Sequence, residues 1–316
     1  MITRRNVLAG AVAAGALMNT RFAFAKASQP ATKVNFDVPP GACDCHTHIH
    51  GDPEKFPWFA GRVYTPEAAL PSEMTALHKA LRIQRVVIVT PSVYGTDNSA
   101  TLYGMKARGA NARGVAVIDG KTTESELDTM GLLGMRGIRL NLSTGGTNVP
   151  AIGRQRLQVA VDRMKRRNWH VQLATNLAMI AAMKDIIAAS PVPVVFDHFG
   201  GANEKLGVQQ PGFADVVELV RSGKAYVKIS VTAGPRPDYS GFVPLAKALI
   251  AANVDRILWG TNWPHPNSEG GSTERVTPLW QVDDGLVLNQ LPLWAPDAPI
   301  RKKILVDNPA RLYAFG

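Results

Sequence analysis

The sequence predicts a (β/α)8 barrel, in which eight parallel strands form a closed sheet and helices cover its outer face. Three observations support this fold. Segments rich in β-branched residues alternate with helical segments, there are eight such strands, and the chain of 316 residues is long enough for eight units. Strict alternation of strands and helices indicates a parallel sheet. A doubly wound open sheet is the alternative, but no Gly-x-Gly-x-x-Gly motif follows the first strand to favour it.

The first strand is predicted over residues 43–50, after a Pro-Pro-Gly entry. A Gly- and Pro-rich loop over 51–71 follows, and loops of this length in compact domains are usually functional. The β-branched run at 85–90 is typical of a strand buried on both faces. The remaining strands are predicted at 114–118, 137–142, 170–174, 192–196, 226–230 and 256–259. Helices are predicted at 72–81, 97–109, 123–132, 153–168, 177–189, 212–221, 241–252, 277–289 and 299–312.

Residues 1–25 have the pattern of a cleaved export signal. Arg4 and Arg5 precede an apolar run, and Ala23-Phe24-Ala25 offers a small-residue cleavage site. Paired arginines are typical of a twin-arginine signal, so we expect a periplasmic mature protein that is not membrane-bound. The apolar run is short and rich in Ala and Gly, which disfavours the alternative of a retained anchor. We expect residues 26–40 to form a polar arm and 41–316 to form one domain.

Composition limits the partners that this chain can have. It is 46% hydrophobic and 19% charged, as in a globular protein. The net charge of +10 falls to +7 when the three arginines before residue 26 are removed. The basic residues are scattered without interleaved aromatic residues, so we expect no nucleic-acid partner. A modest positive field favours an anionic substrate, whereas the composition does not specify an oligomeric state.

Histidines recur at every second position of the first strand. Alternation along a strand places Asp44, His46, His48 and His50 on one face. A single histidine is usually structural, but three on one face favour a catalytic or metal site. The two cysteines, Cys43 and Cys45, share the other face. An i, i+2 pair is poorly placed for a disulfide, so we interpret them as buried strand residues, with a Cys-x-Cys metal clip as the alternative.

Further polar residues follow the other strands. In a barrel the active site lies at the carboxyl ends of the strands, so residues at these ends should converge. The candidates are His46, His48, Ser92, Arg139, Asn141, Asp197, His198, Asn262 and His265. We expect Asp197 to orient His198 from behind. We expect His170 to be structural because it begins its strand, His78 to lie on a surface helix, and His265 to make a loop contact near the site.

These motifs, taken in order, resemble the amidohydrolase superfamily. The resemblance covers residues 41–315 and is closest to the branch of 2-pyrone-4,6-dicarboxylate hydrolases and lactonases. It rests on Asp44-Cys45-His46-Thr47-His48, Phe56-Pro57, Tyr64-Thr65-Pro66, Gly95-Thr96-Asp97-Asn98, Arg113-Gly114-Val115-Ala116, Gly137-Ile138-Arg139-Leu140-Asn141, Asp197-His198 and Trp259-Gly260-Thr261-Asn262-Trp263-Pro264-His265-Pro266. It implies a barrel that acts on small carboxylated lactones. By this resemblance His46, His48, Tyr64, Ser92, Arg139 and His198 line the substrate pocket.

Asn262 is the main departure from the family pattern, which has an aspartate there as the base that activates water. An amide does not take up a proton near neutral pH. We therefore expect lactone isomerisation, in which a substrate hydroxyl attacks the carbonyl, as in the galactarolactone isomerases of this branch. The alternatives are a lactone hydrolase of the 2-pyrone-4,6-dicarboxylate or muconolactone type, and a periplasmic solute binder without activity. Of the family's carboxylate-binding arginines only Arg139 is clear, so the substrate should differ from a pyrone dicarboxylate.

Metal-dependent members of the superfamily supply Lys or His from the middle strands and Asp from strand eight. This chain has Asn141, Asn176 and Asn262 at those places, and amides are weak ligands. We therefore expect activity without a metal or any other cofactor. If zinc does bind, His46, His48 and His198 are the expected ligands.

Overall fold

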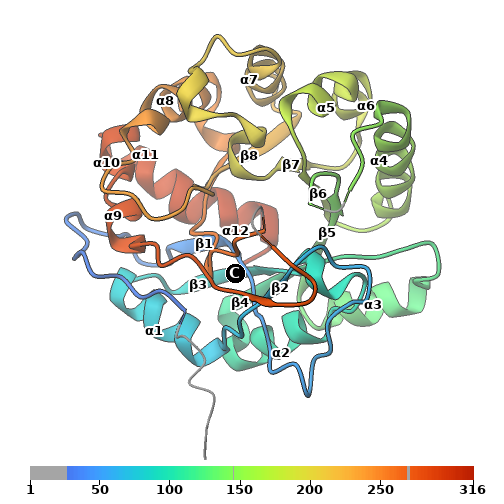
Figure 1. Cartoon of the computed structure of the whole chain (residues 1–316). Helices are drawn as coiled ribbons and strands as arrows, with labels where there is room; N and C mark the ends of the chain where they lie inside the picture. Colours follow the sequence, from blue (N-terminus) through green and yellow to red (C-terminus); the bar gives the residue numbers. More distant parts are fainter. Residues whose placement is uncertain (1–26, 145, 269–270) are drawn as a thin grey trace, which may run out of the picture.

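The computed structural model describes residues 27–144, 146–268 and 271–316 of the chain (Figure 1). The predicted export signal at 1–25 lies outside these residues. Eight parallel strands pair with their neighbours in chain order and form one central sheet. This arrangement confirms the predicted barrel. They are β1 (Cys43–Thr47), β3 (Arg85–Val89), β4 (Ala112–Ala116), β5 (Met135–Asn141), β6 (His170–Ala174), β7 (Val194–Phe196), β8 (Ala225–Ile229) and β9 (Ile257–Trp259).

Helices surround this sheet (Figure 1). They are α1 (Pro71–Leu81), α2 (Ser99–Arg108), α3 (Glu124–Leu132), α4 (Pro150–Met164), α5 (Leu177–Ala182), α6 (Lys184–Ala189), α7 (Phe213–Arg221), α8 (Val243–Ala252), α9 (Asp284–Leu288), α10 (Leu291–Trp294), α11 (Ala298–Lys302) and α12 (Asn308–Tyr313). No helix among the described residues combines the length and apolar character that a bilayer crossing requires.

Three predicted elements differ from the structure. The helix predicted at 177–189 is two helices, because Met183 leaves the helical conformation with ψ of 6°. The helix predicted at 277–289 begins only at Asp284, where the Asp283 side chain accepts hydrogen bonds from the first backbone N–H groups. The last predicted helix is divided into α11 and α12 by a π-helical turn at Lys303–Asp307.

The seam between β1 and β9 closes the barrel. Strand β1 pairs regularly with β3 only at its start, and its register shifts between Asp44 and Thr47. Beyond the end of β9, Asn262 N–H donates to the His46 carbonyl at 2.8 Å, and His48 N–H donates to the Trp263 carbonyl at 2.8 Å. Backbone hydrogen bonds therefore connect the histidine strand directly to the loop that carries Asn262.

Alternation along the strands separates two apolar layers. Side chains such as Val86 and Ile88 pack outward against the helices. The neighbouring Val87 and Val89 point into the barrel, with Cys43 and Cys45 among other residues, and the C-terminal Tyr313 lies in the same cluster. Both cysteines are buried and unpaired, as the strand interpretation expects. Apolar side chains thus fill much of the barrel interior, and the polar residues gather at the carboxyl ends of the strands.

Candidate active site

A cavity of about 640 Å³ opens at the carboxyl ends of the strands. Six of the nine strand-end candidates line it: His48, Ser92, Arg139, Asp197, His198 and Asn262. Tyr64, which the family resemblance placed in the pocket, lines it too, as do Thr175 and Trp280. A cavity of this volume suits a small organic ligand. The carboxyl ends of the strands therefore bring residues from distant parts of the sequence to one cavity, as predicted.

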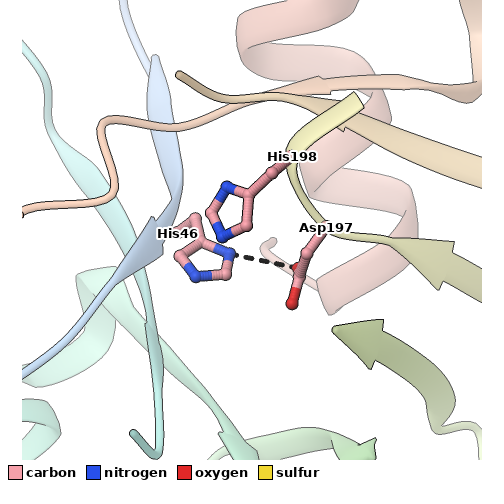
Figure 2. A group of neighbouring side chains, drawn as sticks. All are labelled: His46, Asp197 and His198. Atoms are coloured by element: carbon pink, nitrogen blue, oxygen red, sulfur yellow. Dashed lines mark ion pairs between the residues drawn. The ribbon is translucent and has the colours of Figure 1, made fainter. Parts of the chain in front are cut away.

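The other three candidates lie elsewhere. His46 is fully buried, and its ring packs against the cavity-lining His198 ring, with centroids 4.4 Å apart (Figure 2). The His48 ring, which also lines the cavity, has its centroid 5.0 Å from that of His46. Asn141 lines a neighbouring cavity beside α4. His265 is buried in its loop, where its Nε2 contacts Asp284 at 3.0 Å. The histidine cluster is thus compact, while Asn141 and His265 stand outside the cavity.

Asp197 is the centre of a buried charge cluster. Arg139 Nε donates to its Oδ2 at 3.0 Å, and Gln172 Nε2 donates to the same oxygen at 3.1 Å. Its Oδ1 lies 3.2 Å from His46 Nδ1 and 3.4 Å from Lys228 Nζ. Asp197 therefore does not stand behind His198 as expected. It holds Arg139 and the buried Lys228 instead.

Lys228 and Gln172 are functional candidates that sequence reasoning missed. Lys228 Nζ donates to Gln172 Oε1 at 2.7 Å and contacts His46 Nδ1 at 3.2 Å. Both side chains are fully buried inside the barrel. The sequence does contain a sign of both residues, because each is polar and lies in the middle of an apolar strand. In a closed barrel, such a residue must either face the interior or pack against a helix.

Burial shifts the ionisation of the cluster. Burial opposes the charged form of Asp197, but contacts with His46, Lys228 and Arg139 hold the pKa of this carboxyl well below its usual range. Burial lowers the pKa of His46 and of His48 well below the usual value, and it lowers the pKa of His198 to about 4. At neutral pH the three imidazoles are therefore uncharged, while Asp197 is an anion.

Each cavity-facing imidazole has a fixed partner on its Nδ1 side. His48 Nδ1 donates to the Val89 carbonyl at 2.7 Å. His198 Nδ1 lies 3.2 Å from Ser230 Oγ. Such contacts orient an imidazole and leave its Nε2 for a ligand.

Tyr64 reaches the cavity from the long loop after β1. The next residues form the short strand β2 (Thr65–Pro66), which pairs in parallel with β10 (Val276–Thr277) from the loop after β9. Neither strand was predicted, because two residues carry no periodicity. Burial raises the pKa of Tyr64 to about 12, and its hydroxyl interacts with Ser92. Tyr64 is therefore a protonated hydrogen-bond donor at neutral pH.

A second polar cluster lies behind the histidines. Asp44 Oδ1 accepts from Thr261 N–H at 3.0 Å, and Oδ2 accepts from Thr261 Oγ1 at 2.6 Å. His78 Nε2 contacts the same carboxylate at 3.2 Å. The expectation that His78 lies on the surface is wrong: it is fully buried, because α1 turns it inward to Asp44.

The donor set fits a divalent metal poorly. Ligand atoms of His46, Asp197 and His198 all lie within 4.8 Å of one another (Figure 2). However, Asp197 is already paired with Arg139, and Lys228 Nζ lies within 3.4 Å of both Asp197 and His46. A metal ion here would meet two buried cations and no second carboxylate ligand among these residues. No chemical step is therefore assigned to a metal.

The chain matches known proteins over most of its length. A family model described as Amidohydrolase matches residues 43–315. A 2-pyrone-4,6-dicarboxylate hydrolase from Comamonas testosteroni is 32% identical over 294 residues, which cover 89% of this chain and 93% of that protein. A D-galactarolactone isomerase from Agrobacterium fabrum is 27% identical over 291 residues, which cover 90% and 95%. A crystal structure from Agrobacterium tumefaciens shares the fold, with a TM-score of 0.75, 24% identity, and coverage of 91% and 98%.

Proposed function

Because this chain belongs to the amidohydrolase family and matches lactone-processing enzymes, we propose that it isomerises a small carboxylated lactone by acyl transfer at the lactone carbonyl. The observation that carries this proposal is the residue at position 262. Asn262 lines the cavity, and Asp197 is the only carboxylate among the described lining residues. Asp197 is committed to Arg139, Gln172 and Lys228. Its pKa is held well below the usual range, so this carboxylate is a poor base for deprotonating water.

An internal nucleophile suits such a site. A substrate hydroxyl that is already held beside the carbonyl reacts as if it were present at about 10⁵–10⁸ M. This advantage compensates for a weak proton acceptor, whereas attack by free water has no such advantage. A sugar-acid lactone carries the hydroxyl groups that ring migration requires.

Binding follows from the charges at the cavity. Arg139 is an anion-binding group at the cavity wall, with only its Nε donating to Asp197. Its remaining N–H groups are suited to a substrate carboxylate. The hydroxyl of Tyr64 and the Ser92 side chain add neutral donors beside it. These donors polarise the lactone carbonyl and stabilise the oxyanion that forms there.

Hydrolysis is the second candidate, and one observation favours it. The hydrolase from Comamonas testosteroni is 32% identical to this chain, compared with 27% for the isomerase. The two functions differ in their product: hydrolysis releases an open-chain diacid, and isomerisation returns a lactone of different ring size.

Asn262→Asp distinguishes the two functions. Asn262 has φ of 69°, a conformation that Asp also tolerates, so the exchange should leave the fold intact. General-base catalysis contributes about 10²–10⁴-fold, and we expect the variant to gain hydrolysis by at least about tenfold. NMR would follow ring migration and diacid release with D-galactarolactone, and ring opening to the open-chain triacid with 2-pyrone-4,6-dicarboxylate. Rapid hydrolysis by the wild-type protein would contradict the isomerase proposal, and a folded variant without gain would show that position 262 does not face the attacking oxygen.

A further inference from the structure

His46 and His48 share one strand face, yet different atoms contact their Nδ1 positions. His48 Nδ1 lies 2.7 Å from the Val89 carbonyl oxygen, which has no proton to give. The proton must therefore be on His48 Nδ1, and His48 Nε2 keeps a bare lone pair. Since His48 lines the cavity, this lone pair is a proton acceptor available to a bound ligand.

His46 meets the opposite kind of partner. Lys228 Nζ makes a hydrogen bond with His46 Nδ1 at 3.2 Å, and an ammonium group can only donate. The His46 Nδ1 then holds the lone pair, and its proton is on Nε2. His46 Nε2 is buried and has no hydrogen-bond partner among the described residues, so it is a donor without an acceptor.

Asp197 is the competing partner of His46 Nδ1. Its Oδ1 lies 3.2 Å from Nδ1, the contact drawn as an ion pair in Figure 2. Among the described residues, the Lys228 contact with Nδ1 has hydrogen-bond geometry, whereas Asp197 Oδ1 makes no hydrogen bond of such geometry. Lys228 also donates to Gln172 Oε1 at 2.7 Å, which aims the ammonium group between Gln172 and His46.

We propose that Lys228 and the Val89 carbonyl hold His46 and His48 in opposite tautomers, so that buried His46 keeps its proton on Nε2 while the bare Nε2 of cavity-lining His48 is the general base. Lys228 is then a positioning residue. His48 Nε2 is then the proton acceptor that the Asn262 amide cannot be. This inference rests on the proposed lactone chemistry for its reaction step, but the tautomers themselves do not depend on it.

In the proposed acyl transfer, each bond that forms is matched by one that breaks. The attacking hydroxyl oxygen bonds to the carbonyl carbon while its proton passes to His48 Nε2. The carbonyl oxygen becomes an oxyanion that accepts a hydrogen bond from a cavity-lining donor such as the Tyr64 hydroxyl. The tetrahedral intermediate collapses, the original ring C–O bond breaks, and the departing oxygen takes the proton back from His48. No proton is gained or lost overall, as isomerisation requires.

Long-range ¹⁵N–¹H correlation spectra of ¹⁵N-histidine-labelled protein report the tautomer of each ring directly. His46→Gln and His48→Gln would assign the two rings by the loss of their signals. We expect a bare Nδ1 on His46 and a bare Nε2 on His48. A bare Nε2 on His46, or the same tautomer on both rings, would overturn the proposal without any activity measurement.

Lys228→Met tests the cause of the His46 tautomer. We expect the His46 proton to move to Nδ1, where Asp197 Oδ1 is the remaining partner at 3.2 Å, and His48 to stay unchanged. Lys303→Met is the matched control, since it removes a lysine that pairs with Asp255 outside the barrel. An unchanged His46 ring in folded Lys228→Met would show that Lys228 does not set the tautomer. If this variant does not fold, the wild-type spectrum still decides between the two tautomers.

His48→Gln tests the base with D-galactarolactone as the probe. We expect kcat to fall by about 10²–10⁴-fold, the usual contribution of a general base. His50→Gln is the matched control: His50 Nδ1 also contacts a backbone carbonyl, that of Glu67 at 3.2 Å, but His50 does not line the cavity. Retention of wild-type kcat in His48→Gln would refute its role as base. Opposite tautomers in a protein that converts neither D-galactarolactone nor 2-pyrone-4,6-dicarboxylate would count against the proposed function and leave the assignment of the tautomers standing.

Discussion

Two buried histidine–carboxylate pairs of this barrel are alike in geometry and differ in their surroundings. The site pair, His46 and Asp197, has an N–O distance of 3.2 Å, and the loop pair, His265 and Asp284, has one of 3.0 Å. Asp197 has Lys228 and Arg139 beside it, and its pKa is held low. Burial raises the pKa of Asp284, against the opposing effect of His265. His46 makes the largest of the contributions that lower the pKa of Asp197, and Lys228 and Arg139 add to it. Since both carboxylates have a histidine partner, the added lysine and arginine are what distinguish the two pairs.

The largest expected effect comes from neutralising the site pair. Asp197→Asn leaves the Lys228 and Arg139 cations buried without a counter-charge. Loss of one partner from a buried ion pair costs about 3–5 kcal/mol, so we expect the free energy of unfolding to fall by that amount. Urea unfolding followed by circular dichroism would measure it. A loss below about 1 kcal/mol would show that water reaches and screens this cluster.

Lowering the pH should reduce the contribution of His198 to the free energy of unfolding and increase that of Asp284. The folded-state pKa of His198, about 4, lies below the unfolded value of about 6.5. Its contribution to stability is therefore complete above pH 6.5 and is lost as the pH falls toward about 4, by up to about 1.4 kcal/mol per pH unit. The raised pKa of Asp284 contributes stability below its unfolded pKa and loses it as the pH rises through the folded value. Urea unfolding at several pH values should show that the free energy of unfolding falls less steeply with decreasing pH in His198→Gln than in the wild-type protein. Equal pH dependence in the two proteins would contradict the lowered pKa of His198.

Neutralising the loop pair should cost much less. Asp284→Asn keeps a side-chain oxygen that can accept the hydrogen bond from His265 Nε2, and no ion pair of Asp284 with a lysine or arginine is lost within the described residues. The raised pKa shows that burial already disfavours the anion. We expect a change of about 1 kcal/mol or less in the free energy of unfolding at pH 7, measured beside Asp197→Asn. Equal losses in the two variants would remove the distinction between the pairs.

The smallest expected effect is that of metal removal. Since Lys228 and Arg139 already neutralise Asp197, we predict that a chelator leaves the rate of lactone conversion unchanged within about twofold. The measurement is turnover before and after dialysis against a chelator, with metal analysis of the purified protein. Stoichiometric zinc, with activity lost on chelation and restored by zinc, would contradict this prediction.

Most of the fold followed from local patterns. A run such as 85–90 predicts a buried strand by composition alone, and the strand count then fixes the barrel. The cavity followed because barrel geometry requires the strand ends to meet. Six of the candidate side chains do line one cavity, although their chemical roles stay predictions.

The charge cluster could not be predicted in the same way. Lys228 lies in a strand between Val227 and Ile229, and alternation alone does not tell whether a lysine faces solvent, a helix or the barrel interior. The partners of Asp197 also depend on register between strands that are distant in sequence. His78 was misplaced for a related reason, since its contact with Asp44 depends on how α1 packs against β1.

The backbone hydrogen bonds at the barrel seam bear on how the proposed activity could arise and disappear in evolution. Asn262 and Trp263 are joined to His46 and His48 by main-chain atoms, so the distance between the two chain segments does not depend on the side chain at position 262. Replacing the amide by a carboxylate changes proton-transfer capacity without moving the site. A single-nucleotide substitution converts an asparagine codon to an aspartate codon. On the proposed function, one mutational step would then exchange ring migration for ring opening in lineages of this barrel, without passing through an ancestor whose site must be rebuilt.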